Sequence, residues 1–336
     1  MSVSPSAIPV DESARLTMTA VVQDRYGTAS VLATRDISRP EIGENQVLVR
    51  VRAAGVNIAD WAVMGGLPYI ARPVYGMTRP KNPVRGTDVA GVVEAVGPGV
   101  THFKPGDEVF GSADGSYADF AAAPEDQLAP KPTNLSFEQA AATPMAGLVA
   151  QQALRGIRPG QKVLINGASG GVGTFAVQIA KALGAEVTGV CSTRNLEMVR
   201  SIGADHVIDY TKADFTEGGE RYDLIIDNVS NHSLSKLRRA LTATGTLIPN
   251  GGGFGNRWFA SAGRLLRGKL MFGRGSRNMS NFLVSLKSEH LLTLTALIEG
   301  GKVTPVMDRT FALSDAAEAL DRVGQGHARG KTVITA

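Results

Sequence analysis

The feature that most constrains this 336-residue chain is a glycine-rich turn between two apolar runs near its middle. Residues 163–165 are typical of a buried parallel strand, and Ala168-Ser-Gly-Gly-Val-Gly173 follows as a G-x-G-x-x-G variant with alanine first. Residues 171–183 predict a helix, and residues 186–191 predict a second strand. This order indicates the first βαβ unit of a dinucleotide-binding domain.

The glycines of this turn have distinct physical roles in binding a dinucleotide. Gly170 lets the backbone approach a pyrophosphate closely, and Gly173 lets the helix pack tightly on the strand. The free N–H groups at the helix N-terminus then face the pyrophosphate, whose negative charge the helix dipole stabilises. We therefore expect the cofactor to contact Ala168, Ser169, Gly170, Gly171, Val172 and Gly173.

The residues after the second strand indicate which cofactor binds. NAD sites place an acid about 20 residues beyond the first glycine, where it bonds to the ribose 2′-hydroxyl. Here Cys191-Ser-Thr-Arg194 fills that place without an acid. Ser192 and Thr193 are hydrogen-bond donors, and Arg194 can pair with a 2′-phosphate, so the sequence predicts NADPH rather than NADH. The alternative is that Arg194 is an ordinary surface cation near a helix start.

A Rossmann unit that starts this far along the chain implies a separate domain before it, which we expect to hold the substrate. Residues 17–123 are expected to be mostly β, as a small barrel or sandwich interrupted by glycine turns. The expected strands of this region are residues 20–23, 47–53, 89–96 and 108–111. Residues 137–154 predict a helix with a break at Pro144.

The rest of the chain alternates between helical and strand patterns, as a parallel sheet with covering helices requires. Expected strands are residues 206–209, 223–228, 246–249 and 331–335, and expected helices are residues 195–201, 234–241 and 289–299. A last helix is predicted to begin at Ser314, a favourable N-cap, and to end at Gly324. Residues 67–81 and 252–277 show no regular pattern. We expect ligands to bind where the parallel strands end.

Composition excludes several classes of protein. With 43% hydrophobic residues the chain can bury a real core, while a net charge of +4 without a Lys/Arg block argues against nucleic-acid binding. A single cysteine excludes an internal disulfide, and no run approaches the ~18 apolar residues of a membrane span. Residues 1–16 lack the basic start and apolar middle of a signal peptide. We expect them to form a flexible leader on a soluble, cytoplasmic protein.

Several short motifs outside the glycine turn occur together in this chain. They are Ala54-Gly-Val-Asn57-Ile-Ala-Asp60, Gly86-Thr-Asp-Val-Ala-Gly-Val-Val-Glu-Ala-Val-Gly97, Phe103-Lys-Pro-Gly-Asp-Glu-Val109, Gly115-Ser-Tyr-Ala-Asp119 and Gly326-His-Ala-Arg-Gly-Lys-Thr-Val333. With them the chain resembles the medium-chain dehydrogenase/reductase superfamily, and within it the zinc-free quinone oxidoreductase branch. The resemblance covers nearly everything after the leader.

This resemblance implies a two-domain α/β fold. A GroES-like, β-rich substrate domain is expected from residues 17–145 and 285–336. A Rossmann domain with a doubly wound parallel sheet is expected from residues 146–284, where it binds NADPH. The resemblance also implies a homodimer joined edge to edge through the Rossmann sheets.

The zinc-dependent members of the superfamily carry metal ligands that this chain lacks. They place a Cys ligand just after a glycine-containing turn, where this chain has Asn57-Ile-Ala-Asp60, and they carry Gly-His-Glu where it has Gly86-Thr-Asp88. Their four-cysteine structural lobe is missing from this sequence. Zinc is bound by tetrahedral sets of Cys, His or carboxylate ligands, which one Cys and five scattered His do not supply in the family's pattern. We therefore expect no catalytic metal.

Without a Lewis acid, hydride transfer from NADPH suits an acceptor that is already electron-poor. Quinones and α,β-unsaturated carbonyls qualify, since hydride adds to carbon and the negative charge moves to an oxygen. The protein must orient the partners and donate hydrogen bonds to that oxygen. By resemblance to the family's active-site loop, Asn57 is the first candidate donor, and Asp60 is expected to orient the loop or a water. Tyr69 and Tyr75 are further candidates, to cover or stack on the acceptor.

Each of these candidates also has a structural alternative. Asn57 can cap its own turn, Asp60 can be a favourable helix N-terminal charge, and the two tyrosines can simply pack. By resemblance or by their place at strand ends, the remaining cofactor contacts are expected at Thr143, Ser192, Arg194, Tyr210, Asn228, Val229, Asn250, Gly251 and Lys331. For Lys331, the two alternatives are a contact with phosphate or ribose and an exposed position at the end of a strand.

Two other functions are compatible with the same fold. One is an enoyl-thioester reductase or a tailoring reductase of secondary metabolism, and the other is an NADPH-binding sensor or scaffold with little turnover. The intact cofactor motif favours an enzyme. We expect an NADPH-dependent reductase of a small-molecule quinone or enone, without nucleic-acid or membrane partners.

Overall fold

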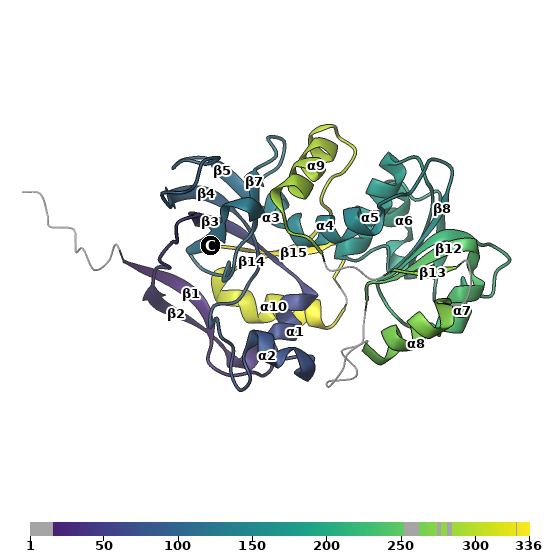
Figure 1. The fold of residues 1–336 in the computed structure, drawn as a ribbon, viewed down its shortest axis with the longest axis horizontal. Coiled ribbons are helices and arrows are strands. Elements are labelled where there is room, and N and C mark those ends of the chain that lie inside the picture. Colours follow the sequence, from purple (N-terminus) through teal and green to yellow (C-terminus); the bar gives the residue numbers. More distant parts are fainter. Residues whose placement is uncertain (1–15, 252–261, 274–276, 281–283, 327) are drawn as a thin grey trace, which may run out of the picture.

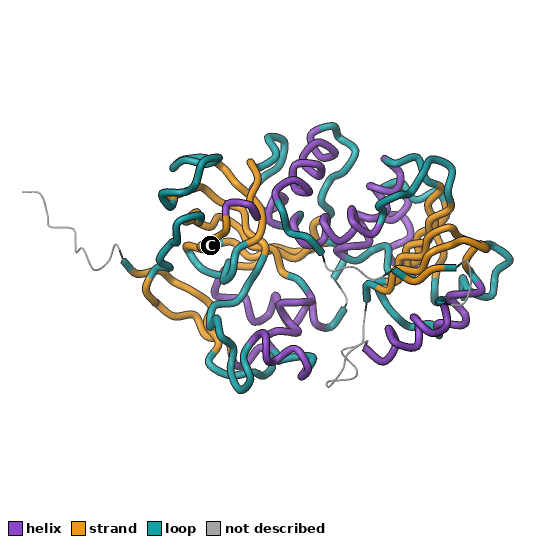
Figure 2. The backbone as a smooth tube through the Cα atoms, viewed as in Figure 1, coloured by secondary structure: helices purple, strands orange, loops and turns teal. Residues whose placement is uncertain are grey.

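The computed structural model describes residues 16–251, 262–273, 277–280, 284–326 and 328–336. Its strands form two large sheets and one separate strand pair, and helices lie between and around the two sheets (Figures 1 and 2). None of the helices in these ranges has the length and hydrophobicity that a membrane crossing requires.

The first large sheet forms the β-rich half of the molecule. In spatial order it contains β14 (Met307–Ala312), β15 (Lys331–Thr335), β3 (Gln46–Val56), β4 (Asp88–Val96), β5 (Glu108–Ser112) and β7 (Leu128–Pro130), with β6 (Phe120–Pro124) also paired to β3. β1 (Thr17–Gln23) and β2 (Leu32–Ser38) form the separate antiparallel pair. Val47, Val49 and Val51 alternate with less buried residues along β3, as expected for a strand with one face on the core.

The second large sheet is entirely parallel. In spatial order it contains β10 (His206–Asp209), β9 (Glu186–Cys191), β8 (Lys162–Asn166), β11 (Tyr222–Asp227), β12 (Leu241–Pro249) and β13 (Asn278–Met279). Counted along the chain from β8, this is the order 3-2-1-4-5-6 of a doubly wound dinucleotide-binding sheet. Helices α5 (Gly171–Ala182), α6 (Leu196–Ser201) and α7 (Leu234–Arg239) pack on its strands. Phe175 and Ile179, one turn apart on α5, are both buried by this packing.

Helices and the C-terminal strand connect the two halves. α3 (Phe137–Ala141) and α4 (Pro144–Ala153) lead from the first sheet into the Rossmann half, where α4 packs on α5. α9 (Ser288–Glu299) packs on α4, and α10 (Ala316–Gly324) packs on α1 (Ile58–Met64). β15 pairs with β3, so the C-terminal segment returns to the first sheet. The expected fold, a GroES-like domain joined to a Rossmann domain, is confirmed, while the domain boundaries remain predictions.

Two segments without a sequence pattern contain helices. After α1, residues 67–81 include a 3₁₀ turn (Tyr69–Ala71) and α2 (Arg72–Tyr75), in which Pro73 occupies the first turn that tolerates proline. α8 (Ala262–Phe272) lies inside the segment 252–277, although its two glycines weaken helix propensity. The expectation of irregular structure is wrong for these helical parts. Residues 252–261 and 274–276 lie outside the described ranges.

The last helix begins later than expected. Ser314 lies in a 3₁₀ turn (Leu313–Asp315), and its hydroxyl bonds to Asp315 Oδ1 at 3.2 Å. α10 then starts at Ala316. The expected N-cap at Ser314 is wrong, because the chain makes a tighter turn before the helix.

Candidate active site

The loop between β8 and α5 has the shape that a pyrophosphate site requires. Gly167 and Ala168 donate their backbone N–H groups to Val190 O (3.1 and 2.9 Å), which ties the loop to the neighbouring strand β9. A Cβ at Gly173 would collide with the Gly167 carbonyl, so only glycine allows this close packing. At Gly170, by contrast, a Cβ would make only an ordinary contact with the Gly167 oxygen at 3.6 Å. A dinucleotide phosphate is therefore expected on this uncrowded side of the loop.

The C-terminal strand runs directly past this loop. Gly330 donates its N–H to Ser169 O (2.9 Å). The stem of Lys331 lies beside Gly171, where an added Cβ would approach Lys331 Cδ to 3.0 Å. Val172 is partly buried and packs against the hydrophobic core. The loop expected to bind the cofactor is thus in contact with the strand that belongs to the β-rich half.

The Lys331 ammonium is buried between the glycine loop and the β-rich half. Only 3% of the residue is exposed, and Nζ donates to Asn57 Oδ1 (2.5 Å) and Val56 O (3.2 Å), with Asp88 Oδ2 at 3.7 Å. Burial lowers the pKa of Lys331, and the Asp88 charge opposes that shift. The alternative of an exposed lysine is therefore wrong, while a contact with the cofactor remains a prediction.

The Asn57 side chain is held from both sides. Its Nδ2 donates to Asp88 Oδ2 (3.0 Å), while its Oδ1 accepts from Lys331. Since an ammonium only donates and a carboxylate only accepts, these partners define which way the amide points. The second amide N–H has no acceptor among the described residues, so it can donate to a ligand. The Asn57 backbone N–H donates to Asp60 Oδ2 (2.8 Å), as in a capping box at the start of α1.

Two buried carboxylates complete this cluster. Asp60 is 5% exposed and also accepts from Tyr117 OH and Thr87 Oγ1 (3.0 Å each), so it anchors the loop rather than facing solvent. Asp88 is fully buried and accepts the Met145 N–H (3.1 Å) at the start of α4. Burial raises the pKa of Asp60 and raises the pKa of Asp88 to about 6, against the lowering effect of their charged and hydrogen-bonded neighbours.

The other expected residues of the β-rich half have local packing roles. Thr143 is buried at the start of α4, where its hydroxyl donates to Gln139 O (2.9 Å). Tyr69 stacks on Arg72, whose guanidinium carbon lies 4.4 Å from the ring centroid. Tyr75, at the end of α2, is 42% exposed. A role of either tyrosine at the acceptor, and of Thr143 at the cofactor, remains a prediction.

At the end of β9, a buried amide joins two serines of the expected cofactor site. Asn195 Nδ2 donates to Ser169 Oγ (3.1 Å) and Ser192 Oγ (3.2 Å). Arg194 is exposed in the same turn, and Tyr210, which follows the adjacent strand β10, is 58% exposed. The structure thus brings the two serines together and places Arg194 and Tyr210 at the same edge of the sheet.

The ends of β11 and β12 hold the four residues expected near the nicotinamide. Asn250 Nδ2 donates to Asn228 Oδ1 (2.7 Å), and Gly251 N donates to Asp227 O (2.8 Å). A Cβ at Gly251 would collide with the Asn228 backbone, so glycine is required there. Val229 is exposed, and Asn228 Nδ2 is buried without a partner in the described part of the chain. This unpaired donor leaves Asn228 able to bind a ligand.

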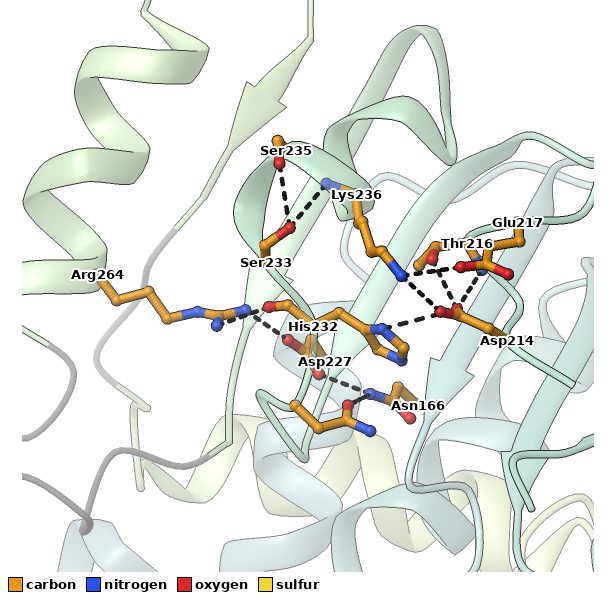
Figure 3. Close-up of polar contacts among 11 residues, drawn as sticks. Asn166, Asp214, Thr216, Glu217, Asp227, His232, Ser233, Ser235, Lys236 and Arg264 are labelled. Carbon is orange, nitrogen blue, oxygen red and sulfur yellow. Dashed lines mark hydrogen bonds and ion pairs between the residues drawn. The ribbon is translucent and has the colours of Figure 1, made fainter.

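Figure 3 shows how the turn after β11 is held, with Asp227 between Asn166 and Arg264. Asp227 is fully buried, accepts from Asn166 Nδ2 (2.9 Å) and pairs with Arg264 Nη2 (3.1 Å) of α8. It also accepts the Ser230 N–H (2.9 Å), and Arg264 donates to His232 O (2.9 Å). Through these bonds, α8 anchors the strand end at which the nicotinamide half of the cofactor is expected.

Several residues of the site were not expected from the sequence, namely Tyr117, Asn166, Asn195, Asp227 and Arg264. Asp88 was noted only as part of the segment that stands where zinc-dependent members carry Gly-His-Glu. Asn166 and Asp227 each end an apolar run, at the carboxyl edge of the parallel sheet where ligands bind. This position in the sequence could have identified them. Nothing local marks Tyr117 or Arg264, whose carboxylate partners lie 57 and 37 residues away.

Comparisons with known proteins agree with this geometry. Residues 43–133 match the family model described as alcohol dehydrogenase GroES-like domain, and residues 202–334 match the one described as zinc-binding dehydrogenase. The chain is 34% identical to the chloroplastic quinone-oxidoreductase QR1 of Triphysaria versicolor, over 94% of this chain and 98% of that protein. It is 32% identical to the chloroplastic NADPH-dependent alkenal/one oxidoreductase of Arabidopsis thaliana, over 97% of this chain and 82% of that protein.

A solved structure shows the same fold. The quinone oxidoreductase from Coxiella burnetii superposes with a TM-score of 0.84 at 30% identity, covering 95% of this chain and 99% of that one. The similarity therefore spans both halves of the molecule. From these matches, the chain belongs to the medium-chain dehydrogenase/reductase superfamily, in its quinone oxidoreductase-like branch.

Proposed function

We propose that this protein is an NADPH-dependent, zinc-independent oxidoreductase that reduces a quinone or an α,β-unsaturated carbonyl. The observation that carries the proposal is the Asn57 amide, held between Lys331 and Asp88 with one N–H left for a ligand. The glycine loop that fits a dinucleotide contacts the same lysine. The names of two relatives, a quinone oxidoreductase and an NADPH-dependent alkenal/one oxidoreductase, support this chemistry.

The cofactor site is proposed to extend along the carboxyl edge of the parallel sheet. The loop at Gly170 and the N-terminus of α5 would hold the pyrophosphate, and Asn228 and Gly251 would line the nicotinamide half. When NADPH is bound, its reduced nicotinamide supplies a hydride. The chain's own task is then to orient the acceptor and to stabilise the charge that forms on it.

The proposed role of Asn57 is to stabilise negative charge on the acceptor oxygen. Its second N–H donates to the enolate or hydroquinone oxygen as charge develops there. Lys331 bonds to Oδ1 of the same amide, which polarises the amide and strengthens its N–H donors. Because Lys331 and Asp88 already hold the amide, little reorganisation is needed when the acceptor arrives.

Zinc independence is proposed from the donor set. Asn57 and Asp88 lie in the two segments where zinc-dependent members carry ligands, and here they bond to each other. The buried Lys331 ammonium beside them would repel a cation. No three His, Cys, Asp or Glu side chains come together as a metal site within the ranges that the structure describes. We therefore expect a chelator to leave turnover unchanged.

Two further points remain proposals, a homodimer joined edge to edge through the Rossmann sheets and a cytoplasmic location. The first rests on the family resemblance, and size-exclusion chromatography with light scattering tests it. The second rests on the composition of the sequence. Since the two relatives named above are chloroplastic, fractionation of cells that express the full chain is the direct test.

The assay follows NADPH oxidation at its absorbance band with ortho- and para-quinones, enones and enoyl thioesters, with NADH in parallel and with chelator. Turnover of quinones or enones with NADPH is the expected result. Turnover restricted to enoyl thioesters would favour the alternative reductase. Tight NADPH binding without turnover of any acceptor would favour a sensor or scaffold.

Asn57→Ala tests the proposed donor. Loss of one donor to a developing oxyanion lowers kcat by about 10²-fold or more, and we expect that loss here with the NADPH Kd nearly unchanged. The control is Asn134→Ala, which removes an amide that bonds to Ile298 O (3.0 Å) and should leave kcat unchanged. An unchanged kcat in Asn57→Ala would remove this residue from the mechanism.

A further inference from the structure

We propose that Asn195 sets the direction of two serine hydroxyls and thereby makes the cofactor site select a ribose 2′-phosphate. The inference rests on the proposed NADPH dependence and names a residue that produces it. Asn195 is a positioning residue in this account, because its amide acts on the cofactor through Ser169 and Ser192.

The three side chains meet at the carboxyl ends of two neighbouring parallel strands. Ser169 lies in the glycine loop after β8, and Ser192 directly follows β9. Asn195 ends the 3₁₀ turn that comes next (Thr193–Asn195), and its backbone N–H donates to Ser192 O (2.9 Å). The residue is 5% exposed, and its Nδ2 lies 3.1 Å from Ser169 Oγ and 3.2 Å from Ser192 Oγ. The amide is therefore held between the two hydroxyls through Nδ2, while its Oδ1 is buried without a partner among the described residues.

The amide determines which way each hydroxyl donates. An amide nitrogen has two N–H donors and does not accept, so both serine oxygens act as acceptors toward Asn195. Each hydroxyl has a single hydrogen, which must then point away from the amide. The described residues place no acceptor against the hydrogen of Ser169 or Ser192. The pair therefore presents two O–H donors at the edge of the sheet.

Two O–H donors suit a phosphate better than a sugar hydroxyl. A 2′-phosphate offers strong acceptor oxygens and negative charge, so each bond to it is charge-assisted. A site for NADH instead offers the ribose 2′-hydroxyl an acceptor, usually an acid. With their hydrogens directed outward, Ser169 and Ser192 match the first ligand.

The charged groups around this turn agree with that preference. Arg194 is exposed in the same turn and contributes positive charge. Asp209, at the end of the adjacent strand β10, accepts from Thr193 Oγ1 (2.6 Å) and from the N–H and Oγ1 of Thr211 (3.0 and 2.7 Å). These hydrogen bonds, the one from Thr193 most of all, lower the pKa of Asp209. They bring donors of the chain itself to both carboxylate oxygens, so Asp209 has fewer free lone pairs for a ribose hydroxyl.

The test compares Asn195→Asp with Asn195→Ala and measures the Kd of NADPH and of NADH by fluorescence titration. A carboxylate has the same shape as the amide but only accepts, so it turns both hydroxyls inward. Each hydrogen bond lost costs about tenfold in affinity, and Asn195→Asp removes the bonds of both serine hydroxyls to the phosphate. We therefore expect the ratio of the NADH Kd to the NADPH Kd to fall about 100-fold in this variant. Asn195→Ala leaves the hydroxyls unheld but free to donate, and its preference should fall by about tenfold.

A double-mutant cycle separates hydroxyl direction from the negative charge that Asn195→Asp adds. Replacing both Ser169 and Ser192 with alanine should weaken NADPH binding about 100-fold in the wild-type background. In the Asn195→Asp background the same replacement should cost almost nothing, because the hydroxyls no longer face the phosphate. Equal losses in both backgrounds would overturn the inference, since the aspartate would then act by charge alone.

The Kd values of the wild type for NADPH and NADH test the proposed cofactor independently of Asn195. A wild-type protein that binds NADH as tightly as NADPH contradicts the proposed cofactor. A wild type that prefers NADPH, and keeps that preference in both Asn195 variants, overturns only the inference. If circular dichroism shows that Asn195→Asp does not fold, Asn195→Ala and Ser192→Ala decide the question, because an unchanged preference in both overturns it.

Discussion

At the residue scale, Lys331 joins the two halves of the candidate site. Its stem passes the glycine loop at Gly171, and its ammonium reaches Asn57 and Asp88. A buried charge is costly unless it is paired and hydrogen-bonded, and the carboxylate and two oxygens around Nζ offset that cost. The same contacts hold Asn57 in the orientation that the proposed reaction uses.

Lys331→Met should therefore damage both stability and turnover. Removing one partner of a buried pair costs about 3 kcal/mol, and the free energy of unfolding in urea should fall by roughly that amount. We expect kcat to fall as well, because Asn57 loses the group that orients it. Lys181→Met is the control, since its exposed pair with Asp205 (2.8 Å) contributes less than about 1 kcal/mol.

The double variant Lys331→Met with Asp88→Asn separates these two effects. It removes both buried charges, so stability should recover in part. Turnover should stay low, because no ammonium holds Asn57 Oδ1. A kcat that recovers together with stability would mean that Lys331 acts only on the fold.

At the element scale, α8 is a helix outside the parallel sheet that stabilises the strand ends where the cofactor is proposed to bind. Its Arg264 is 23% exposed and pairs with the fully buried Asp227, whose turn carries Asn228 and Val229. The helix also packs beside β13, the last strand of the sheet. A contact from one helix thus positions two residues of the expected nicotinamide half.

Arg264→Leu should loosen this strand end. It leaves the Asp227 carboxylate buried without its cation, which should lower the free energy of unfolding by roughly 2 kcal/mol after allowance for partial exposure, and should raise the NADPH Kd. Arg267→Leu, at an exposed position of the same helix, should change neither. Urea unfolding and NADPH titration measure both quantities, and equal effects of the two variants would contradict this role.

At the scale of the whole molecule, the buried cluster makes stability depend on pH. Burial raises the pKa of Asp88 from 3.8 to about 6. Between these values the folded protein keeps a proton that the unfolded chain has released, so the free energy of unfolding falls as pH rises through this window. A shift of about 2 units corresponds to roughly 3 kcal/mol that is present at low pH and lost above the folded pKa.

Urea unfolding of the wild type and of Asp88→Asn, at about pH 4 and about pH 7, tests this dependence. Because asparagine does not ionise, the wild type should lose more stability than the variant as pH rises. Glu299→Gln is a control in which the opposite change is expected. Hydrogen bonds from Thr133 lower the pKa of Glu299, so the wild type should gain stability relative to this variant as pH rises. Equal changes in the wild type and Asp88→Asn would contradict the prediction.

The cofactor loop could be predicted because its signals are local. The close packing that requires glycine at Gly173 arises within one turn of the chain, whereas an added Cβ at Gly170 would make only an ordinary contact with Gly167 O. The sequence predicted Asn195 as the start of a helix, whereas Asn195 ends a 3₁₀ turn, and its role depends on Ser169, which is 26 residues away. α8 could not be predicted because its glycines lower helix propensity, while the contact of Arg264 with Asp227 is tertiary.

The sequence was enough to predict the βαβ unit, most strands of the parallel sheet and a nicotinamide dinucleotide as the cofactor. These depend on hydrophobic period, glycine conformation and local charge, which neighbouring residues set. Which buried polar groups meet depends on the folded chain, as Lys331 meets Asn57 across 274 residues. The physical reason is that a charge leaves water at low cost only where packing brings a distant partner within bonding distance.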